Sequence, residues 1–267
     1  NGQTETVNAL TATSNGTLVL DNTSSSPATF RFGANNSTVN FGSGTGSYSI
    51  QNSGTGALSL VKLGNTSTTF NSGILLNHAG ITASEGGGSF TIAAAVNATS
   101  GLRATGSSTL ALTGGITNPG LITSIEVGGG SILSLLDGAG SAISNLTNLN
   151  LGAGSGTATL NLNIGDSATD TLTLLTGGTL NLANSVTFNL TDTGLSPLTT
   201  YTLLNLIDGG ITAFGTGNMI QGATPGGFSG FTWNVTNNLV QITTGTLVTG
   251  SLYWRGLAGG GTDTTWT

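Results

Sequence analysis

The sequence is poor in the residues on which most enzymes and nucleic-acid-binding proteins depend. Cysteine is absent, there is one histidine, and only 5% of the 267 residues are charged, against about 25% in an ordinary globular domain. The missing cysteine excludes disulfides and thiolate metal ligands. The four basic residues form no cluster that could displace counterions from phosphates, so nucleic-acid binding is not expected; they are Arg31, Lys62, Arg103 and Arg255.

Long apolar runs and charged helix surfaces are missing as well. No apolar stretch approaches the roughly 20 residues of a membrane-spanning helix, and runs such as Ser131 to Leu136 have the length of a strand. Polarity comes from Asn, Thr, Ser and Gly instead of from Lys, Glu and Arg. We therefore expect almost no helix and no membrane span. The chain begins with Asn1, and we expect a mature or excised piece of a longer exported protein.

Short alternating strands are the dominant pattern. The chain is 36% hydrophobic, which is enough to form a core, and runs of about four to seven residues recur between Gly, Asn, Ser and Asp punctuation. In the segment 159–164 the apolar residues Leu160, Leu162 and Ile164 occupy every second position, which predicts one buried and one wet face. The pattern predicts an all-β protein.

The wet positions of these strands carry Asn and Thr, where globular sheets usually carry Lys and Glu. In a stacked solenoid like residues lie above one another at about 4.8 Å, so that amides and hydroxyls can form ladders that like charges would resist. The composition therefore favours a β-solenoid, with a large β-sandwich as the alternative. Coils of roughly 20 to 27 residues would give about ten coils.

The texture of the sequence changes near residue 195 and again near residue 245. Aromatic residues gather between Phe214 and Trp233, where larger rings could cover the end of a solenoid, because such an end exposes unpaired strands. We expect a solenoid body at 1–194 and a C-terminal cap or sandwich-like element at 195–244. Residues 245–267 read as a terminal strand with a Gly-rich tail, which is either the start of a next module or a donated strand.

Candidate catalytic and metal-binding residues are few, and each fits a turn. His78 is interpreted as a turn residue, because a Ser-His-Asp triad needs partners that the sequence does not locate. Asp166 and Asp170 flank a turn, where Asp bonds nearby backbone amides; the alternatives are a carboxylate pair that cleaves polysaccharide and a calcium site, which Asp263 could also provide. The run 86–88 is read as a turn, since no phosphate-loop Lys follows. We predict no catalytic, cofactor or metal residue.

Several segments resemble the passenger regions of bacterial autotransporters and the autotransporter-associated β-strand repeat proteins. Gly54 to Gly64 is similar to the family's repeat opening, a Gly-rich turn followed by an apolar strand with a Lys-x-Gly exit. The segments 170–182, 201–204, 231–233 and 239–243 are similar to the closing portion of such passengers, and Tyr253-Trp254-Arg255-Gly256 to an element that opens a new module. The resemblance implies a right-handed parallel β-helix, bacterial secretion, and a role in adhesion or surface structure.

The expected function is a non-enzymatic extracellular building block of a self-assembling fibre, sheath or surface layer. Its partner would be another copy or a tandem module, and the terminal strand from Leu247 would complete a neighbour's sheet edge. One alternative is an adhesin that contacts a host surface or glycan through Phe214 to Trp233, and another is a polysaccharide-degrading enzyme. The residues predicted for self-assembly are Leu247, Leu252, Tyr253, Trp254 and Trp266.

Overall fold

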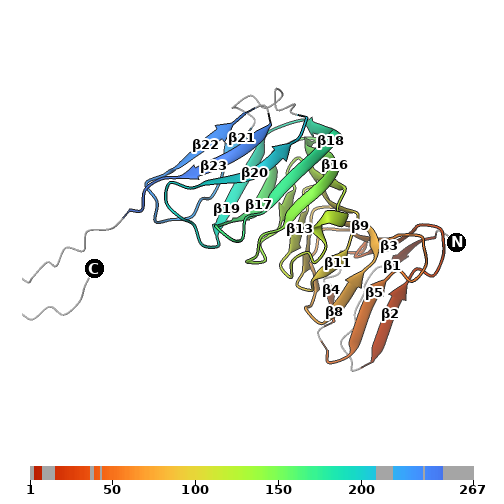
Figure 1. The fold of residues 1–267 in the computed structure, drawn as a ribbon. Helices are drawn as coiled ribbons and strands as arrows, with labels where there is room; N and C mark the ends of the chain where they lie inside the picture. Colours follow the sequence, from red (N-terminus) through yellow and green to blue (C-terminus); the bar gives the residue numbers. More distant parts are fainter. Residues whose placement is uncertain are drawn as a thin grey trace, which may run out of the picture.

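The computed structural model describes residues 3–7, 16–36, 39–42, 44–208, 219–236 and 238–248. Within these ranges the chain is all-β: it contains β-strands, one 3-10 turn (η1, Pro119–Leu121) and no α-helix (Figure 1). The expectation of almost no helix is confirmed for this part of the chain. Here too, no helix is long and apolar enough to cross a membrane.

The strands form three sheets, which we call A, B and C. In spatial order, sheet A contains β1 (Thr4–Val7), β3 (Ala28–Phe32), β6 (Leu58–Lys62), β9 (Ala79–Glu85), β12 (Gly101–Thr105), β14 (Ser124–Gly128), β16 (Ala142–Ala153), β18 (Thr171–Leu182), β20 (Thr200–Leu206), β23 (Leu239–Thr244) and β22 (Phe231–Val235). Sheet B contains β21 (Met219–Gln221), β19 (Val186–Asp192), β17 (Ala158–Ile164), β15 (Ile132–Ser134), β13 (Thr109–Leu112), β10 (Ser89–Ile92), β7 (Thr68–Phe70) and β4 (Val39–Phe41). Sheet C contains β11 (Val96–Ala98), β8 (Ile74–Asn77), β5 (Ser47–Gln51) and β2 (Thr17–Asp21).

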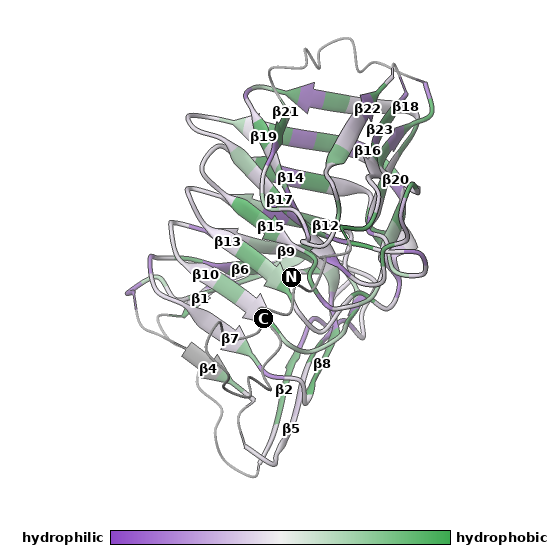
Figure 2. Ribbon diagram, turned by 90° about the vertical axis from the view of Figure 1, so that its left-hand side faces the viewer, coloured by the Kyte–Doolittle hydropathy of each residue, from purple (hydrophilic) through white to green (hydrophobic). Residues whose placement is uncertain are grey.

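Except for β22 and β23, neighbouring strands within a sheet are not consecutive in the sequence. As far as β20, the chain leaves sheet A for sheet B, sheet C or both, and then returns to sheet A and pairs in parallel with the strand it left. Figure 2 shows the strands of sheet B lying one above another. Paired residues are 20 positions apart at Thr82 and Leu102 and 32 apart at Leu172 and Leu204, so some turns of the chain are longer than expected. These large parallel sheets are consistent with a β-helix or solenoid.

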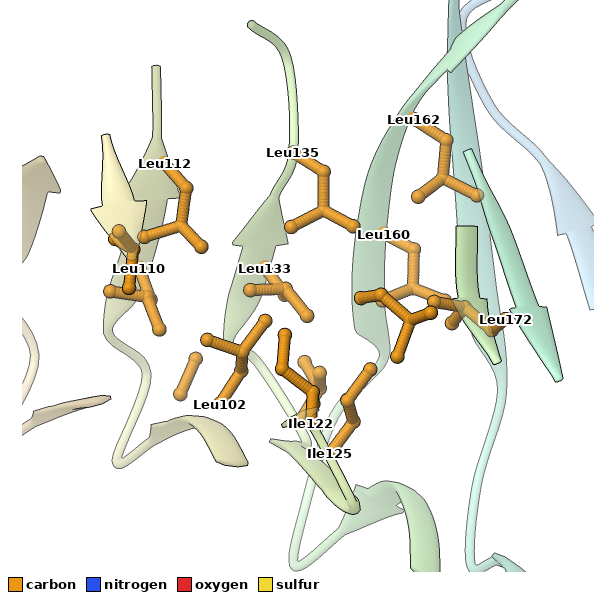
Figure 3. Close-up of a cluster of buried hydrophobic side chains, with 14 of the residues drawn as sticks. Leu102, Leu110, Leu112, Ile122, Ile125, Leu133, Leu135, Leu160, Leu162 and Leu172 are labelled. Carbon is orange, nitrogen blue, oxygen red and sulfur yellow. The ribbon is translucent and has the colours of Figure 1, made fainter. Parts of the chain in front are cut away.

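The core is a column of apolar side chains arranged in rows. On sheet B one row runs through Phe90, Leu110, Leu133, Leu160 and Phe188, which are register partners on successive strands and are all buried. Figure 3 shows three of these leucines in sequence, with Leu102 and Ile125 approaching from the facing side. Burial of each such side chain stabilises the fold by about 1.5–3 kcal/mol. The alternation of apolar residues seen in the sequence places these side chains on the inner face.

Glycines form the corner between sheets A and B. Gly64, Gly86 and Gly106 all have positive φ, of 76°, 91° and 68°, where side chains other than Gly are strained. They also lie against one another: a Cβ on Gly64 would lie 2.4 Å from the Gly33 carbonyl oxygen, and a Cβ on Gly86 would lie 2.9 Å from the Gly64 nitrogen. The run 86–88 is therefore a corner turn, as interpreted from the sequence.

Strand direction changes in the last part of the described chain. β23 pairs antiparallel with β20, and β22 pairs antiparallel with β23. The Trp233 ring packs against Phe188, with 5.5 Å between ring centroids, and its Nε1 donates a hydrogen bond to Gln221 Oε1 at 2.8 Å. This side chain therefore links sheet A to sheet B at the C-terminal end of the stack. The division at 1–194, 195–244 and 245–267 stays a prediction.

Candidate functional site

His78 lies in the corner between β8 and β9 and is fully buried. Its Nδ1 lies 2.9 Å from the Leu58 carbonyl oxygen and its Nε2 lies 3.1 Å from Thr82 Oγ1, so a neutral ring can donate at Nδ1 and accept at Nε2. Burial lowers the pKa of His78 to about 4. It is a turn residue, as predicted, but a buried one. The alternation of Ile74, Leu76 and His78 was the signal that places its ring on the inner face.

The structure gives Asp166 and Asp170 different surroundings. Asp170 is fully buried and accepts backbone hydrogen bonds from Ser141 and Asn163, both at 2.7 Å. Burial raises its pKa to about 7. Asp166 is exposed and accepts hydrogen bonds from the hydroxyls of Ser196 and Tyr201, with the Ser196 bond lowering its pKa. The two carboxylates thus serve separate hydrogen-bond networks and do not act as one pair.

Asp166 lines an open depression of about 580 Å³ on the outside of the molecule. Tyr201 is buried with its hydroxyl at this surface, where it donates to Asp166 and accepts from the Ser196 N–H at 2.8 Å. Hydroxyl groups of Thr169, Thr199 and other residues complete the lining. Asp166, Tyr201 and Ser196 already bond one another, so these bonds hold the chain near Asp166 and Ser196 in place. The surface of the depression is rich in hydroxyl groups.

Asn163 occupies an unexpected place. The alternation of the segment 159–164 places it on the wet face, but the structure buries it, with 1% exposure. Its Nδ2 donates to the carbonyl oxygens of Leu135 (2.9 Å) and Ala139 (2.7 Å) and to Asp137 Oδ1 (2.9 Å). The expected wet position is wrong because the turn after β15 covers Asn163. The carbonyl groups of Leu135 and Ala139 in this turn need a donor, which the buried amide provides. No feature of the sequence announces this role.

Lys62 is a second buried polar residue that sequence reasoning missed. It lies in an inner row between Phe32 and Ser84, and its Nζ donates a hydrogen bond of 2.6 Å to the Gly64 carbonyl oxygen. Burial lowers the pKa of Lys62 to about 8. A Cβ on Gly88 would lie 2.2 Å from Nζ, so the glycine makes room for the amine. In the part of the chain that the structure describes, no three His, Cys, Asp or Glu residues gather to hold a metal ion; Asp263 lies outside it.

The two ends of the stack carry the remaining candidate surfaces. Among the described strands, β1 ends sheet A at one side and β22 at the other, so each has a free edge. The N-terminal end holds a recess of about 400 Å³ lined by Glu5, Val7, Leu20, Phe30 and neighbouring residues. The C-terminal end holds one of about 440 Å³ lined by Met219, Gln221, Trp233, Asn234 and Val235. Such edges are templates for pairing with another chain.

Of the residues predicted for self-assembly, one can be placed. Leu247 is 53% exposed and forms an antiparallel bridge with Phe228. Leu252, Tyr253, Trp254 and Trp266 lie outside the described residues. The terminal strand therefore stays a prediction.

Comparisons of the chain with protein-family models, with curated proteins and with solved structures found no match.

Proposed function

We propose that this chain is a non-enzymatic structural protein of the bacterial cell exterior, a right-handed parallel β-solenoid that serves as a subunit or module of a self-assembling fibre, sheath or surface layer. The observation that carries the proposal is the pair of ends described above, β1 at one side and β22 with β21 at the other. Each has a strand edge that no described strand covers, beside a partly apolar recess. A stack of this kind can be lengthened at its ends, because a further strand would satisfy the free backbone groups.

The chemistry of the interior supports a structural role. His78, Lys62 and Asp170 are buried, and each bonds backbone groups near a corner. Groups that catalyse reactions must reach a substrate, whereas these three are enclosed by the stack. The resemblance of Gly54 to Gly64 to autotransporter-associated repeats is in line with secretion and a surface role.

An adhesin is the second candidate, and one surface favours it. Leu198 is 70% exposed and has a φ of 56°. Its sequence neighbours Ser196 and Thr199 line the Asp166 depression with hydroxyl groups. Apolar and hydroxyl groups together are suited to a glycan. In the aromatic segment from Phe214 to Trp233, Phe214 lies outside the described residues. The rings of Phe228 and Phe231 pack on each other with 5.8 Å between their centroids, so this part of the segment is partly occupied by its own packing.

Sedimentation velocity of the purified chain over a wide concentration range tests the proposal. A self-assembling subunit gives species that grow with concentration, whereas an adhesin stays monomeric and binds a glycan array or cells through the depression. Removal of residues 249–267 tests the donated strand separately, because growth that survives this deletion does not use it. Turnover on a polysaccharide panel that is lost in Asp166→Asn would overturn the non-enzyme assignment.

A further inference from the structure

In the part of the chain that the structure describes, the two outermost strands of sheet A have the same direction. All strands from β1 to β20 pair in parallel. The two antiparallel steps, from β20 to β23 and from β23 to β22, then reverse the direction twice. β22 therefore runs the same way as β1. In sheet B the terminal strand β21 is also parallel to its neighbour β19.

This equality of direction restricts how two copies can meet. If the β1 of a second copy is placed beside the β22 of the first copy without turning that copy over, the two strands run in the same direction and can pair in parallel. A two-fold contact between two N-terminal ends would instead place β1 against β1 in antiparallel pairing. Translation without closure gives an open, head-to-tail series, which is a filament.

The charges of the ends favour the head-to-tail contact. The N-terminal end carries Glu5 on β1 and Asp21 on β2, and both line its recess. Two N-terminal ends in contact would bring these carboxylates together. β21, β22 and β23 contain no charged residue, so a C-terminal end meets the acidic end without repulsion.

Glu5 also has an unusual position for a charged residue. It is the register partner of Phe30, whose side chain belongs to the core, so it lies on the inward-facing row of sheet A. Its counterparts on β22 are apolar and half-buried: Phe231, Trp233 and Val235. An inward-pointing charge on an edge strand limits edge-to-edge pairing, because burying an unpaired carboxylate is costly.

We propose that copies of this chain stack head to tail, with the free edge of β22 in one copy pairing in parallel with the free edge of β1 in the next, and that Glu5 keeps this contact weak and reversible. The inference rests on the proposed self-assembling function and names the two surfaces that meet.

Single cysteines test the contact, because the chain has none of its own. If Trp233 stacks on the row of Glu5, the outward-facing Asn234 comes beside Thr6 of the next copy, about 4.8 Å away, within the 4.4–6.8 Å that a disulfide spans between Cα atoms. Asn234→Cys is mixed with Thr6→Cys under mild oxidation, and Asn148→Cys, an exposed position in the middle of sheet A, replaces Asn234→Cys as the matched control. We expect a mixed disulfide at least tenfold more abundant with Asn234→Cys than with the control.

Charge removal tests the role of Glu5. Glu5→Gln is compared with Glu126→Gln, which removes the same charge from the middle of sheet A. We expect Glu5→Gln to lower the concentration needed for assembly about tenfold, and Glu126→Gln to leave it within twofold. Equal effects of the two variants would overturn the proposal that Glu5 weakens the contact.

The outcomes separate the contact from the function. Assembly and the mixed disulfide, if both persist after removal of residues 249–267, support the self-assembling function and the β22–β1 contact. Assembly without the mixed disulfide leaves the structural function standing and overturns the β22–β1 contact. No assembly and no mixed disulfide at any concentration overturns both.

Discussion

Buried polar side chains bond backbone carbonyl groups at the corners of this stack, as Lys62 and Asn163 show. His78 could be assigned to the inner face because Ile74, Leu76 and His78 alternate with outward residues. Lys62 could be assigned in the same way, because Leu58 and Leu60 precede it at alternate positions. Asn163 could not, because it lies in the outward row of its strand and is buried where its amide bonds carbonyl groups of the neighbouring corner. Alternation reports which face a residue takes, and it does not report where a corner leaves unpaired backbone.

Replacing Lys62 by Met should stabilise the protein at neutral pH. The folded chain holds this amine at a pKa of about 8, below its usual 10.5. The free-energy cost of burying the charged amine is therefore fully present below pH 8 and disappears as pH rises toward 10.5. Met fills a similar volume without a charge, and the Gly64 carbonyl keeps the N–H of Gly88 as a donor. We expect a gain of about 1–3 kcal/mol in the free energy of unfolding at pH 7, measured by urea denaturation. A loss at pH 7, or a gain that persists undiminished at pH 11, would contradict this account.

His78 and Asp170 should produce opposite pH dependences of stability. The pKa of His78 falls to about 4 from 6.5, so the unfolded chain binds more protons between these values and stability rises with pH. The pKa of Asp170 rises to about 7 from 3.8, so the folded chain binds more protons and stability falls as pH rises through this window. The two slopes nearly cancel between pH 4 and pH 6.5 in the unaltered chain.

Single substitutions uncover each slope. In Asp170→Asn the free energy of unfolding should rise by about 2 kcal/mol between pH 4.5 and pH 6.5, and in His78→Gln it should fall by a similar amount, since each proton contributes about 1.4 kcal/mol per pH unit. The measured quantity is the change in the free energy of unfolding between the two pH values, because both variants also lose stability overall. Parallel pH profiles for the two variants would show that neither group titrates as inferred.

At the scale of elements, the alternation of apolar residues predicted many strands closely. The alternating runs Ala28–Phe32, Ser89–Ile92 and Thr109–Leu112 coincide with β3, β10 and β13. Alternation alone would divide the long strand β18 into two strands, because Thr176-Gly177-Gly178 interrupts its apolar pattern. Pairing partners could not be read from alternation, since a period of two is common to parallel and antiparallel sheets.

The corner glycines allow a matched test of an element boundary. Gly64→Ala places a side chain at a φ of 76° with its Cβ 2.4 Å from the Gly33 carbonyl oxygen, whereas Gly73→Ala meets nothing within 4 Å and needs no positive φ. We expect Gly64→Ala to lower the free energy of unfolding by about 2 kcal/mol or more and Gly73→Ala to change it by less than about 0.5 kcal/mol. Denaturant titration of both variants measures these changes. Equal losses of stability in the two variants would contradict the claim that the corner requires glycine at residue 64.

At the scale of the whole molecule, the polarity of the two ends matters more than any single residue. Two reversals of strand direction restore, at β22, the direction in which β1 began. Ladders of like neutral residues cross the strands, as expected from composition: the Asn189 amide donates to Asn161 Oδ1 at 2.9 Å, and the hydroxyls of Thr200 and Thr243 lie 2.8 Å apart. The varying length of the turns could not be predicted, because a corner loop can lengthen without altering the strands it joins.

Negative-stain electron microscopy of the purified chain at high concentration is the most direct test of the central claim, that free edges of equal polarity at the two ends let copies add in line. The account predicts unbranched filaments one stack wide, which become longer in Glu5→Gln. A field of separate, compact particles at every concentration, in both the unaltered chain and Glu5→Gln, would contradict it.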